Sequence, residues 1–173
     1  IRIDDQLCKQ GKGITLYSSF KQNLKGDKMY TVFEDSEGDE WILTNKGISI
    51  IGKKQVDSDF PFQYIKEADG IIYLVSQSDK LASYNFKTRQ FKFIEIPYHV
   101  SMINEVKKFD SNTLLLATDN GLIIYKIKEK EFQLIDIRTS TQPSSVVQSV
   151  FQDHYKELWI FPQTTGVIRY NPS

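Results

Sequence analysis

The chain has 173 residues, of which 40% are hydrophobic and 13% aromatic, and its 22 basic residues balance 22 acidic ones. A domain of this length can bury a substantial core. The balanced charge provides no strong attraction for nucleic acid or an anionic lipid surface, so we expect neither nucleic-acid binding nor direct membrane contact. The single cysteine, Cys8, excludes an intrachain disulfide, and no apolar run approaches the roughly 18 residues of a membrane-spanning helix.

A repeat with a period of roughly 40 residues runs through the chain. It predicts five copies, which occupy residues 1–27, 28–59, 60–100, 101–143 and 144–173. One apolar position recurs in all of them, as Leu7, Trp41, Leu74, Leu115 and Trp159. A second position recurs ten or eleven residues later, as Tyr17, Ile51, Tyr84, Tyr125 and Tyr170.

Each copy is interpreted as four short strands, named a to d, because its β-branched and aromatic runs partly alternate with polar residues and are separated by polar turns. Strand a ends at a recurring aspartate and strand b carries the Trp or Leu position. Strand c runs from a recurring glycine to the tyrosine position, and strand d holds a phenylalanine. No stretch of roughly 12 or more residues shows a helical period with caps.

Taken in chain order, the copies match the repeat unequally. The first matches weakly, at 1–4, 7–10 and 13–17, and no signal peptide is visible at Ile1, so we expect a mature domain or a piece of a longer chain. The third and fourth copies align without a gap, and Leu74 corresponds to Leu115 in this alignment. The fifth repeats the motif of the second, from Val150 onward, and stops before its strand d.

Two recurring residues are expected at the corners between strands. The aspartate that ends strand a is expected to cap the a–b turn with its own carboxylate. The glycine that opens strand c suits a corner that requires a positive φ. It is present as Gly13, Gly47, Gly121 and Gly166, and Lys80 replaces it in the third copy.

Four antiparallel strands at this period predict an all-β fold of β-propeller blades, about five repeats that form part of a larger, for example seven-bladed, propeller. A single blade cannot bury both of its faces, so the recurring Trp and Leu are expected between blades. An open stack would expose an apolar face and an unpaired strand edge, so we expect a homodimer or contact with the rest of the propeller. A closed five-bladed ring is the alternative.

The second copy, from Val32 through Asp35, Trp41 and Ile42 to Gly47, resembles the two-component regulator propeller repeat. That repeat has the form apolar-x-x-Asp-x-x-Gly-x-Leu-Trp-Ile-Gly-Thr-x-x-Gly-Leu and is followed by a strand ending in Tyr-Asp or Tyr-Asn. The fifth copy is similarly close, with two departures. Lys156 stands where glycine is usual, and Pro162 stands where threonine is usual.

The resemblance implies an extracytoplasmic sensor propeller, the periplasmic part of an inner-membrane hybrid two-component protein that carries a histidine kinase elsewhere. It also implies a glycan-derived oligosaccharide as ligand and a role in regulating transcription. The motif itself is structural and assigns no ligand residue to this sequence.

Catalytic chemistry has few candidates in this chain. The two histidines, His99 on a d–a connection and His154 in an a–b turn, are interpreted as surface residues. The acidic run 34–40 places Gly38 fourth from Asp35, whereas a calcium-binding EF-hand loop has its glycine sixth, so we expect a solvated turn there. We therefore expect no catalytic residue, metal or cofactor. A propeller glycosidase or lyase, or a protein–protein scaffold, remains the alternative, because a glycosidase needs only two positioned carboxylates.

A ligand site is expected on the loops at one rim, where the b–c and d–a connections meet, because loops carry function in repeat folds. Amides, carboxylates and an exposed aromatic ring there would suit the hydroxyls and the apolar face of a sugar. The candidate ligand-binding residues are Asn45, Lys46, Gln77, Asp79, Tyr98, His99, Asp119, Asn120, Gln142 and Gln163.

Overall fold

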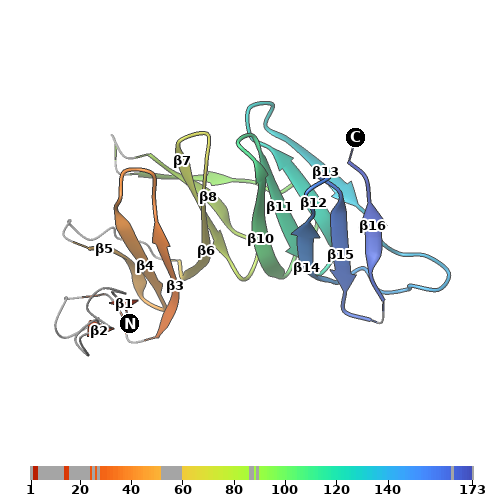
Figure 1. Ribbon diagram of the computed structural model, residues 1–173, viewed down its shortest axis with the longest axis horizontal. Helices are drawn as coiled ribbons and strands as arrows, with labels where there is room; N and C mark the ends of the chain where they lie inside the picture. The colour runs from red at the N-terminus through yellow and green to blue at the C-terminus, as the bar shows by residue number, and fades with distance from the viewer. Residues whose placement is uncertain are drawn as a thin grey trace. The chain divides into compact units, whose positions relative to one another are not determined.

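The structure is a computed structural model that describes residues 2–3, 14–15, 24, 26, 28–51, 60–85, 88, 90–164 and 166–172. The chain divides into two compact units, Ile1–Pro61 and Phe62–Ser173. All regular secondary structure of the described residues is β-strand (Figure 1), which confirms the predicted all-β class. Among these residues, no helix has the length and apolar character needed to cross a bilayer.

The first unit contains a short strand pair and a three-stranded sheet. In the pair, β1 (Arg2–Ile3) runs antiparallel to β2 (Ile14–Thr15). The sheet is an antiparallel meander of β3 (Met29–Glu34), β4 (Glu40–Thr44) and β5 (Gly47–Ile50). Several predicted features of the first two copies, including the Leu7, Gly13 and Tyr17 positions and the fourth strand of the second copy, lie outside the described residues.

The second unit contains three antiparallel sheets, each in simple strand order. The first is built from β6 (Phe62–Ala68), β7 (Ile71–Ser76), β8 (Leu81–Asn85) and β9 (Gln90–Ile94). The second is built from β10 (Ile103–Asp110), β11 (Thr113–Thr118), β12 (Gly121–Lys126) and β13 (Glu131–Ile135). The third is built from β14 (Val147–Gln152), β15 (Leu158–Pro162) and β16 (Ile168–Tyr170).

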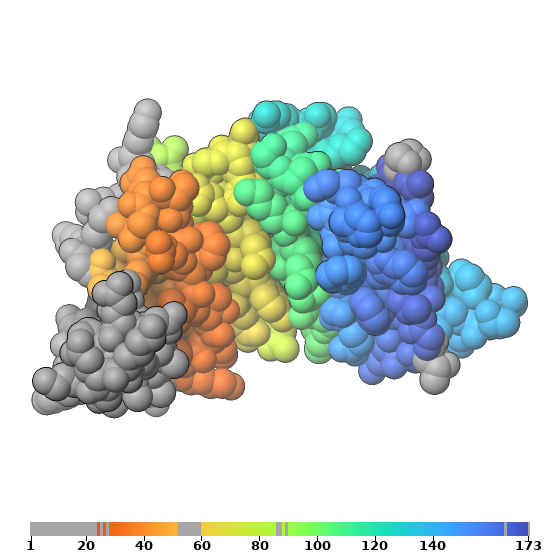
Figure 2. Space-filling model, viewed as in Figure 1, coloured from red at the N-terminus to blue at the C-terminus, as the bar shows by residue number. Residues whose placement is uncertain are grey.

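The three sheets of the second unit stack face to face as successive layers (yellow, green and blue in Figure 2). Their first strands, β6, β10 and β14, contact one another in that order. The sheets do not close into a ring. Four-stranded antiparallel sheets stacked in this way are blades of a partial β-propeller, which confirms the predicted fold class.

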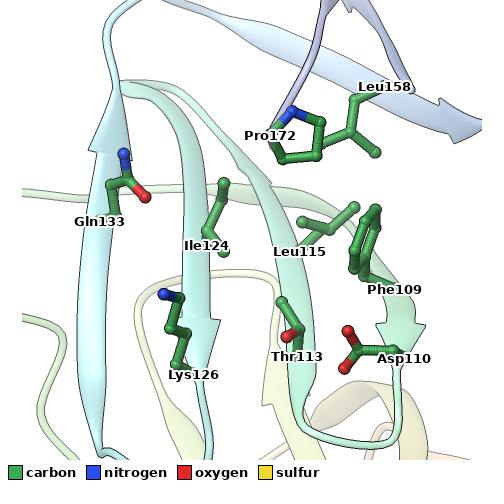
Figure 3. Close-up of a pocket in the computed structure, with 9 residues that line it drawn as sticks. All are labelled: Phe109, Asp110, Thr113, Leu115, Ile124, Lys126, Gln133, Leu158 and Pro172. Atoms are coloured by element: carbon green, nitrogen blue, oxygen red, sulfur yellow. The ribbon is translucent and has the colours of Figure 1, made fainter. Parts of the chain in front are cut away.

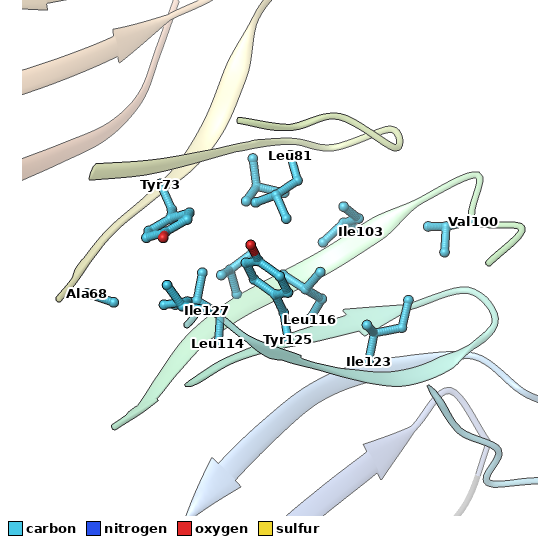
Figure 4. Close-up of a cluster of buried hydrophobic side chains, with 12 residues drawn as sticks. Ala68, Tyr73, Leu81, Val100, Ile103, Leu114, Leu116, Ile123, Tyr125 and Ile127 are labelled. Carbon is cyan, nitrogen blue, oxygen red and sulfur yellow. The ribbon is translucent and has the colours of Figure 1, made fainter. Parts of the chain in front are cut away.

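Strand β11 shows how the blades cover one another, because all six of its residues are buried. Leu114 and Leu116 point toward the β6–β9 sheet and join the cluster in Figure 4, which includes Tyr73 and Leu81. Leu115 points the other way and packs with Leu158 of the third sheet. The recurring Trp or Leu position is therefore an inter-blade position in this blade, as expected.

The recurring tyrosine and phenylalanine form a pair across strands c and d. Tyr84 lies opposite Phe91 with ring centroids 5.2 Å apart, and Tyr125 lies opposite Phe132 with its ring stacked at 4.4 Å. Such cross-strand aromatic pairs add stability beyond the area that they bury. They hold the outermost strand onto each blade.

The recurring aspartate caps the a–b corner, as predicted, and also binds the tryptophan. Asp35 accepts hydrogen bonds from the backbone N–H groups of Glu37 and Asp39 at 3.0 and 2.8 Å. Its second oxygen accepts the indole N–H of Trp41 at 2.8 Å. In the fourth copy, which has no tryptophan, the Asp110 carboxylate accepts the N–H of Asn112, its one hydrogen bond with the described residues.

The glycine corner also forms as predicted. Gly47, Gly121 and Gly166 have φ values of 139°, 108° and 98°, a region that other residues rarely adopt. Beside this corner, the Thr118 hydroxyl donates to the carbonyl of Gly121 and accepts the N–H of Asn120. In the fifth copy, Pro162 occupies the position of Thr118. Proline has no hydroxyl, so these two hydrogen bonds are lost at that corner.

Candidate functional site

The b–c turns and d–a connections of the second unit meet at one rim, where the sequence predicted a ligand site. The N–H of Ile103, at the start of strand a, donates to the carbonyl of Gln77 in a b–c turn at 2.8 Å. The N–H of Asp119 donates to Met102 in the same way at 3.0 Å. The first bond ties a b–c turn to the start of strand a in the next blade, and the second ties a b–c turn to the connection that leads into strand a of its own blade.

Asp119, Asn120 and His99 are brought together at this rim. The carboxylate of Asp119 accepts the N–H of Ser101 at 3.1 and 3.2 Å. The side-chain amide of Asn120 donates to the backbone carbonyl of His99 at 3.0 Å. Both polar side chains therefore fix the d–a connection, while the His99 residue itself is exposed.

Gln142 and the b–c turn that contains Gln163 lie at the neighbouring corner. The Thr164 hydroxyl donates to the side-chain carbonyl of Gln142, and the Gln142 amide donates to the carbonyl of Ser144 at 3.2 Å. The backbone N–H of Gln163 donates to the carbonyl of Val146 at 2.9 Å. The Gln142 side chain closes the corner, and the Gln163 residue is exposed.

Gln77 and Asp79 occupy the b–c turn of the third copy. The Gln77 side chain accepts a hydrogen bond from Gln63 at 3.1 Å. Asp79 pairs with Lys80 at 3.0 Å, and this hydrogen bond is the main reason why the pKa of Asp79 lies below its usual value. An exposed pair of this kind adds little to stability.

Tyr98 does not provide the exposed aromatic ring that the sequence analysis expected. It is only partly exposed, packs against the core cluster of the β10–β13 sheet, and donates its hydroxyl to the carbonyl of Phe132 at 3.0 Å. A tyrosine buries its ring while keeping a partner for its hydroxyl, and strand d supplies both here. Its side chain serves packing rather than an open rim.

Asn45 and Lys46 form the b–c turn of the first unit. The side-chain oxygen of Asn45 accepts the N–H of Lys28 at 3.2 Å, and Lys46 is exposed. The two residues have the same turn geometry as Asp119 and Asn120. Whether they join the rim of the second unit stays a prediction.

The inner strands carry a polar network that sequence reasoning missed. The Tyr64 hydroxyl donates to the carbonyl of Asn104 at 2.6 Å, and the Asn104 amide donates to the carbonyl of Val147 at 2.8 Å. Glu105 accepts the N–H of Val150 at 3.0 Å. These bonds link β6, β10 and β14 in sequence, so three blades are joined by side chains as well as by apolar packing.

The sequence analysis considered His154 and the acidic turn that contains Asp35 for chemistry, and the structure describes both. His154 is exposed and lies against Tyr155, with ring centroids 3.7 Å apart. Within the described residues, no group of three His, Cys, Asp or Glu side chains could hold a metal ion. The acidic turn that was considered for calcium uses its Asp35 carboxylate to bind backbone N–H groups and an indole instead.

A groove of about 200 Å³ lies between the β10–β13 and β14–β16 sheets, at the opposite end from the predicted rim (Figure 3). Four polar side chains from the second sheet reach it: Asp110 from β10, Thr113 from β11, Lys126 from β12 and Gln133 from β13. They lie at or near the a–b and c–d corners. Neither the sequence motif nor the rim argument pointed to this place.

The remaining wall of the groove is apolar. It is formed by Phe109, Leu115, Ile124, Leu158 and Pro172. Leu158 belongs to β15 and Pro172 follows β16, so the third sheet closes one side, as Figure 3 shows. An apolar wall facing a few convergent polar groups is the usual composition of a small-molecule site.

The comparisons with known proteins identify similar folds. One is the extracellular domain of a hybrid two-component system from B. thetaiotaomicron, with a TM-score of 0.73, 21% identity, and coverage of 95% of this chain and 23% of that one. Another is the extracellular domain of a one-component system from the same organism, with a TM-score of 0.73, 20% identity, and coverage of 93% and 24%. The resemblance to sensor propellers is thus confirmed at the level of fold.

A third similar structure is an enzyme, virginiamycin B lyase from Staphylococcus aureus, with a TM-score of 0.63, 15% identity, and coverage of 84% of this chain and 56% of that one. The chain spans about a quarter of the length of the two extracellular domains. No family model matches the chain, and no curated protein matches it.

Proposed function

We propose that this chain is part of an extracytoplasmic sensor propeller of a hybrid two-component signalling protein. The observation that carries the proposal is the fold similarity over almost the whole chain to extracellular domains of such systems. The repeat motif that this sequence resembles contains an aspartate and a tryptophan in each copy. The hydrogen bonds from tryptophan to Asp35 and Asp153 form these corners and support the proposal. The ligand is a glycan-derived oligosaccharide, and its binding regulates a histidine kinase and transcription.

Such a sensor acts by binding its ligand with different affinity in two states of the receptor, because only differential affinity can shift an equilibrium. The three sheets of the second unit are linked across β6, β10 and β14 and therefore move together. These sheets thus act as one body that transmits ligand binding to the rest of a membrane-anchored protein.

The rest of the propeller is a partner of this chain. Phe151 and Phe161 lie on the outer face of the β14–β16 sheet and are 58% and 40% exposed. Trp159 shares that face, and it corresponds in the repeat to Leu115, which is buried between blades. A further blade, or the same face of a second copy, would bury these rings as the third sheet buries Leu115.

A propeller lyase is the second candidate, because virginiamycin B lyase has a similar fold. A lyase needs a general base within reach of its substrate. Both histidines of this chain are exposed, and the two described rim carboxylates are engaged, that of Asp79 by Lys80 and that of Asp119 by the N–H of Ser101. The sensor is therefore favoured.

Calorimetric titration of the complete ectodomain with a panel of oligosaccharides tests the proposal. A sensor gives saturable binding and leaves every sugar unchanged when the cell contents are analysed by chromatography. Product in the cell would favour the enzyme, and the absence of binding across the panel would remove the glycan ligand. Repeating the titration with the 173-residue chain tells whether these blades contain the site.

A further inference from the structure

Two lysines occupy the same repeated position on neighbouring inner strands. Lys66 of β6 and Lys107 of β10 have corresponding places in the strand registers of the third and fourth copies. The two strands contact each other, and the hydrogen bond from the Tyr64 hydroxyl to the carbonyl of Asn104 joins them. The lysines therefore belong to strands whose relative position is fixed.

The Glu105 carboxylate acts on both lysines and is already engaged. One of its oxygens pairs with the Lys107 ammonium group at 3.0 Å, and the other accepts the N–H of Val150 at 3.0 Å. The charge of Glu105 also reaches Lys66, but Lys66 forms no ion pair or hydrogen bond with any residue that the structure describes. Within those residues, the ammonium group of Lys66 is left without a counterion of its own.

Lys66 carries this uncompensated charge in a half-buried place. Burial lowers the pKa of Lys66, the like charge of Lys107 lowers it further, and Glu105 acts in the opposite direction. The two ammonium groups and the one carboxylate leave an excess of one positive charge. A partly desolvated charge of this kind is stabilised when an anion approaches it. The Lys107 side chain is half exposed, so a ligand can reach these charges from solvent.

The repeat itself does not require these charged residues. In the fifth copy, Phe151 occupies the place of the two lysines, and Ser149 occupies the place of Glu105. In the third copy, Tyr64 occupies the place of Glu105. In the second unit, the two lysines and the carboxylate are thus specific to the inner strands of two adjacent copies.

We propose that Lys66 and Lys107 bind the carboxylate group of a ligand at the inner strands of the second unit. Charge-assisted hydrogen bonds from the two ammonium groups to the carboxylate oxygens balance the excess positive charge. A dianion such as sulfate brings a second negative charge beside Glu105 and is therefore disfavoured. The site differs from the predicted rim, and its assignment does not depend on the sensor function.

Three probes present the same carboxylate in different molecules. Acetate represents a free organic acid, glucuronate a sugar acid, and N-acetylalanine the C-terminus of a peptide. Acetate has few heavy atoms, so its dissociation constant is expected to be on the order of 10 mM. The relative affinities of the three probes then identify the source of the carboxylate.

NMR of the lysine side chains in the 173-residue chain tests the proposal directly. Each probe replaces chloride at constant ionic strength, which keeps the general screening of charges the same. Saturable shifts of the Cε resonances of Lys66 and Lys107 are the expected result, and Lys92, an exposed lysine of β9, is the internal control. Glucose, which has no carboxylate, should leave all three resonances unchanged.

Two substitutions in the site have opposite expected effects. Lys66→Met removes one ammonium group and is expected to weaken acetate binding by about fivefold or more, whereas Lys92→Met leaves it unchanged. Glu105→Gln removes the competing negative charge and keeps an acceptor for the N–H of Val150, so it is expected to tighten acetate binding. In chloride alone, Lys66→Met should leave the unfolding midpoint unchanged or higher, because no partner among the described residues is lost.

Any of four results would overturn the proposal. They are the absence of saturable lysine shifts with every probe, equal acetate binding by the Lys66→Met and Lys92→Met chains, weaker acetate binding by the Glu105→Gln chain, and tighter binding of sulfate than of acetate. The calorimetric titration of the complete ectodomain with neutral oligosaccharides is independent of all four. The sensor function and this carboxylate site can therefore fail separately.

Discussion

At the scale of single residues, the Asp35 carboxylate connects the backbone of its corner to a tryptophan side chain. It is almost fully buried and accepts two backbone N–H groups and the indole of Trp41, which is completely buried. Asp35→Ala leaves all three donors without a partner. We expect a loss of about 3 kcal/mol in the free energy of unfolding, measured by urea denaturation.

The fluorescence of Trp41 follows this unfolding when Trp159 is replaced by phenylalanine, because the chain has only two tryptophans. The Trp41→Phe chain provides the matched comparison, with unfolding of both chains followed by far-ultraviolet circular dichroism. If the indole bond matters, Asp35→Ala costs less in that background than in the parent. Equal costs in both backgrounds would show that the indole contributes nothing to the corner.

The corresponding carboxylate of the fifth copy gives a pH dependence. Hydrogen bonds, first that of the Trp159 indole and then those of backbone N–H groups, hold the pKa of Asp153 below its usual value. A lowered pKa in the folded state stabilises the fold above the unfolded pKa of about 3.9, and this contribution is lost as the pH falls below it.

We therefore expect Trp159 fluorescence, recorded with Trp41 replaced by phenylalanine, to report loosening of this corner below about pH 4. Asp153→Asn keeps the size of the side chain and removes its titration. The acid transition at this corner should then flatten. An unchanged transition in the Asp153→Asn chain would assign it to other carboxylates.

Residue patterns predicted these corners well, and the reasons are physical. An aspartate at the end of a strand can cap the following turn and a glycine can adopt a positive φ, so their recurrence predicted the capped a–b turn and the b–c corner. The Lys156 departure is equally clear, because that residue has a φ of 69°, matching the 82° of Gly38 in the second copy. The indole bond to aspartate was not predicted, because sequence spacing does not say where a ring nitrogen points.

At the scale of elements, the outermost strand restricts the b–c corner. A Cβ added at Gly121 would lie 2.6 Å from the carbonyl oxygen of Ile135, the last residue of β13, whereas a Cβ added at Gly166 would meet nothing within 4 Å. Both glycines have a similar positive φ, of 108° and 98°. The two corners therefore differ in the crowding and not in the backbone conformation.

Replacing each glycine by alanine separates the two costs. Gly166→Ala is expected to cost about 1–2 kcal/mol, from the unfavourable φ alone. Gly121→Ala is expected to cost about 2 kcal/mol more, because strand β13 must shift to make room. Thermal unfolding of the two chains checks this difference. Equal losses would mean that β13 gives way freely.

Sequence reasoning was weaker for the site than for the strands. The rim residues lie in the turns where the repeat placed them, yet Asp119, Asn120 and Gln142 use their side chains to fasten those turns. Polar loop residues that bind ligands and polar loop residues that bind the backbone look the same in sequence. The groove was missed because its lining combines Phe109 with residues of β11, β12 and β15, which only the stacking of blades brings together.

At the scale of the whole molecule, the exposed aromatic face of the β14–β16 sheet predicts association. Phe151→Ser together with Phe161→Ser removes exposed rings from a face that does not contribute to the core between sheets. We expect the pair of substitutions to lower self-association of the chain in analytical ultracentrifugation. Phe93→Ser, which removes an exposed ring of β9, should leave it unchanged.

The opposite sedimentation result would contradict a role of this face in self-association. If the parent chain and the double variant sediment identically at every concentration, this face has no role in contacts between copies. A further blade of the same propeller would then be its remaining partner. That partner can be tested by following the fluorescence of Trp159, which lies on the same face as Phe151 and Phe161, in the complete ectodomain.

The central claim is that these blades sense a ligand without converting it. The most direct test uses the full-length protein in membrane vesicles, with autophosphorylation followed as each oligosaccharide of the calorimetric panel is added. The account predicts that phosphorylation changes over the concentration range in which the ectodomain binds and that the sugar is recovered intact. Consumption of the sugar, or binding with no change in phosphorylation, would contradict it.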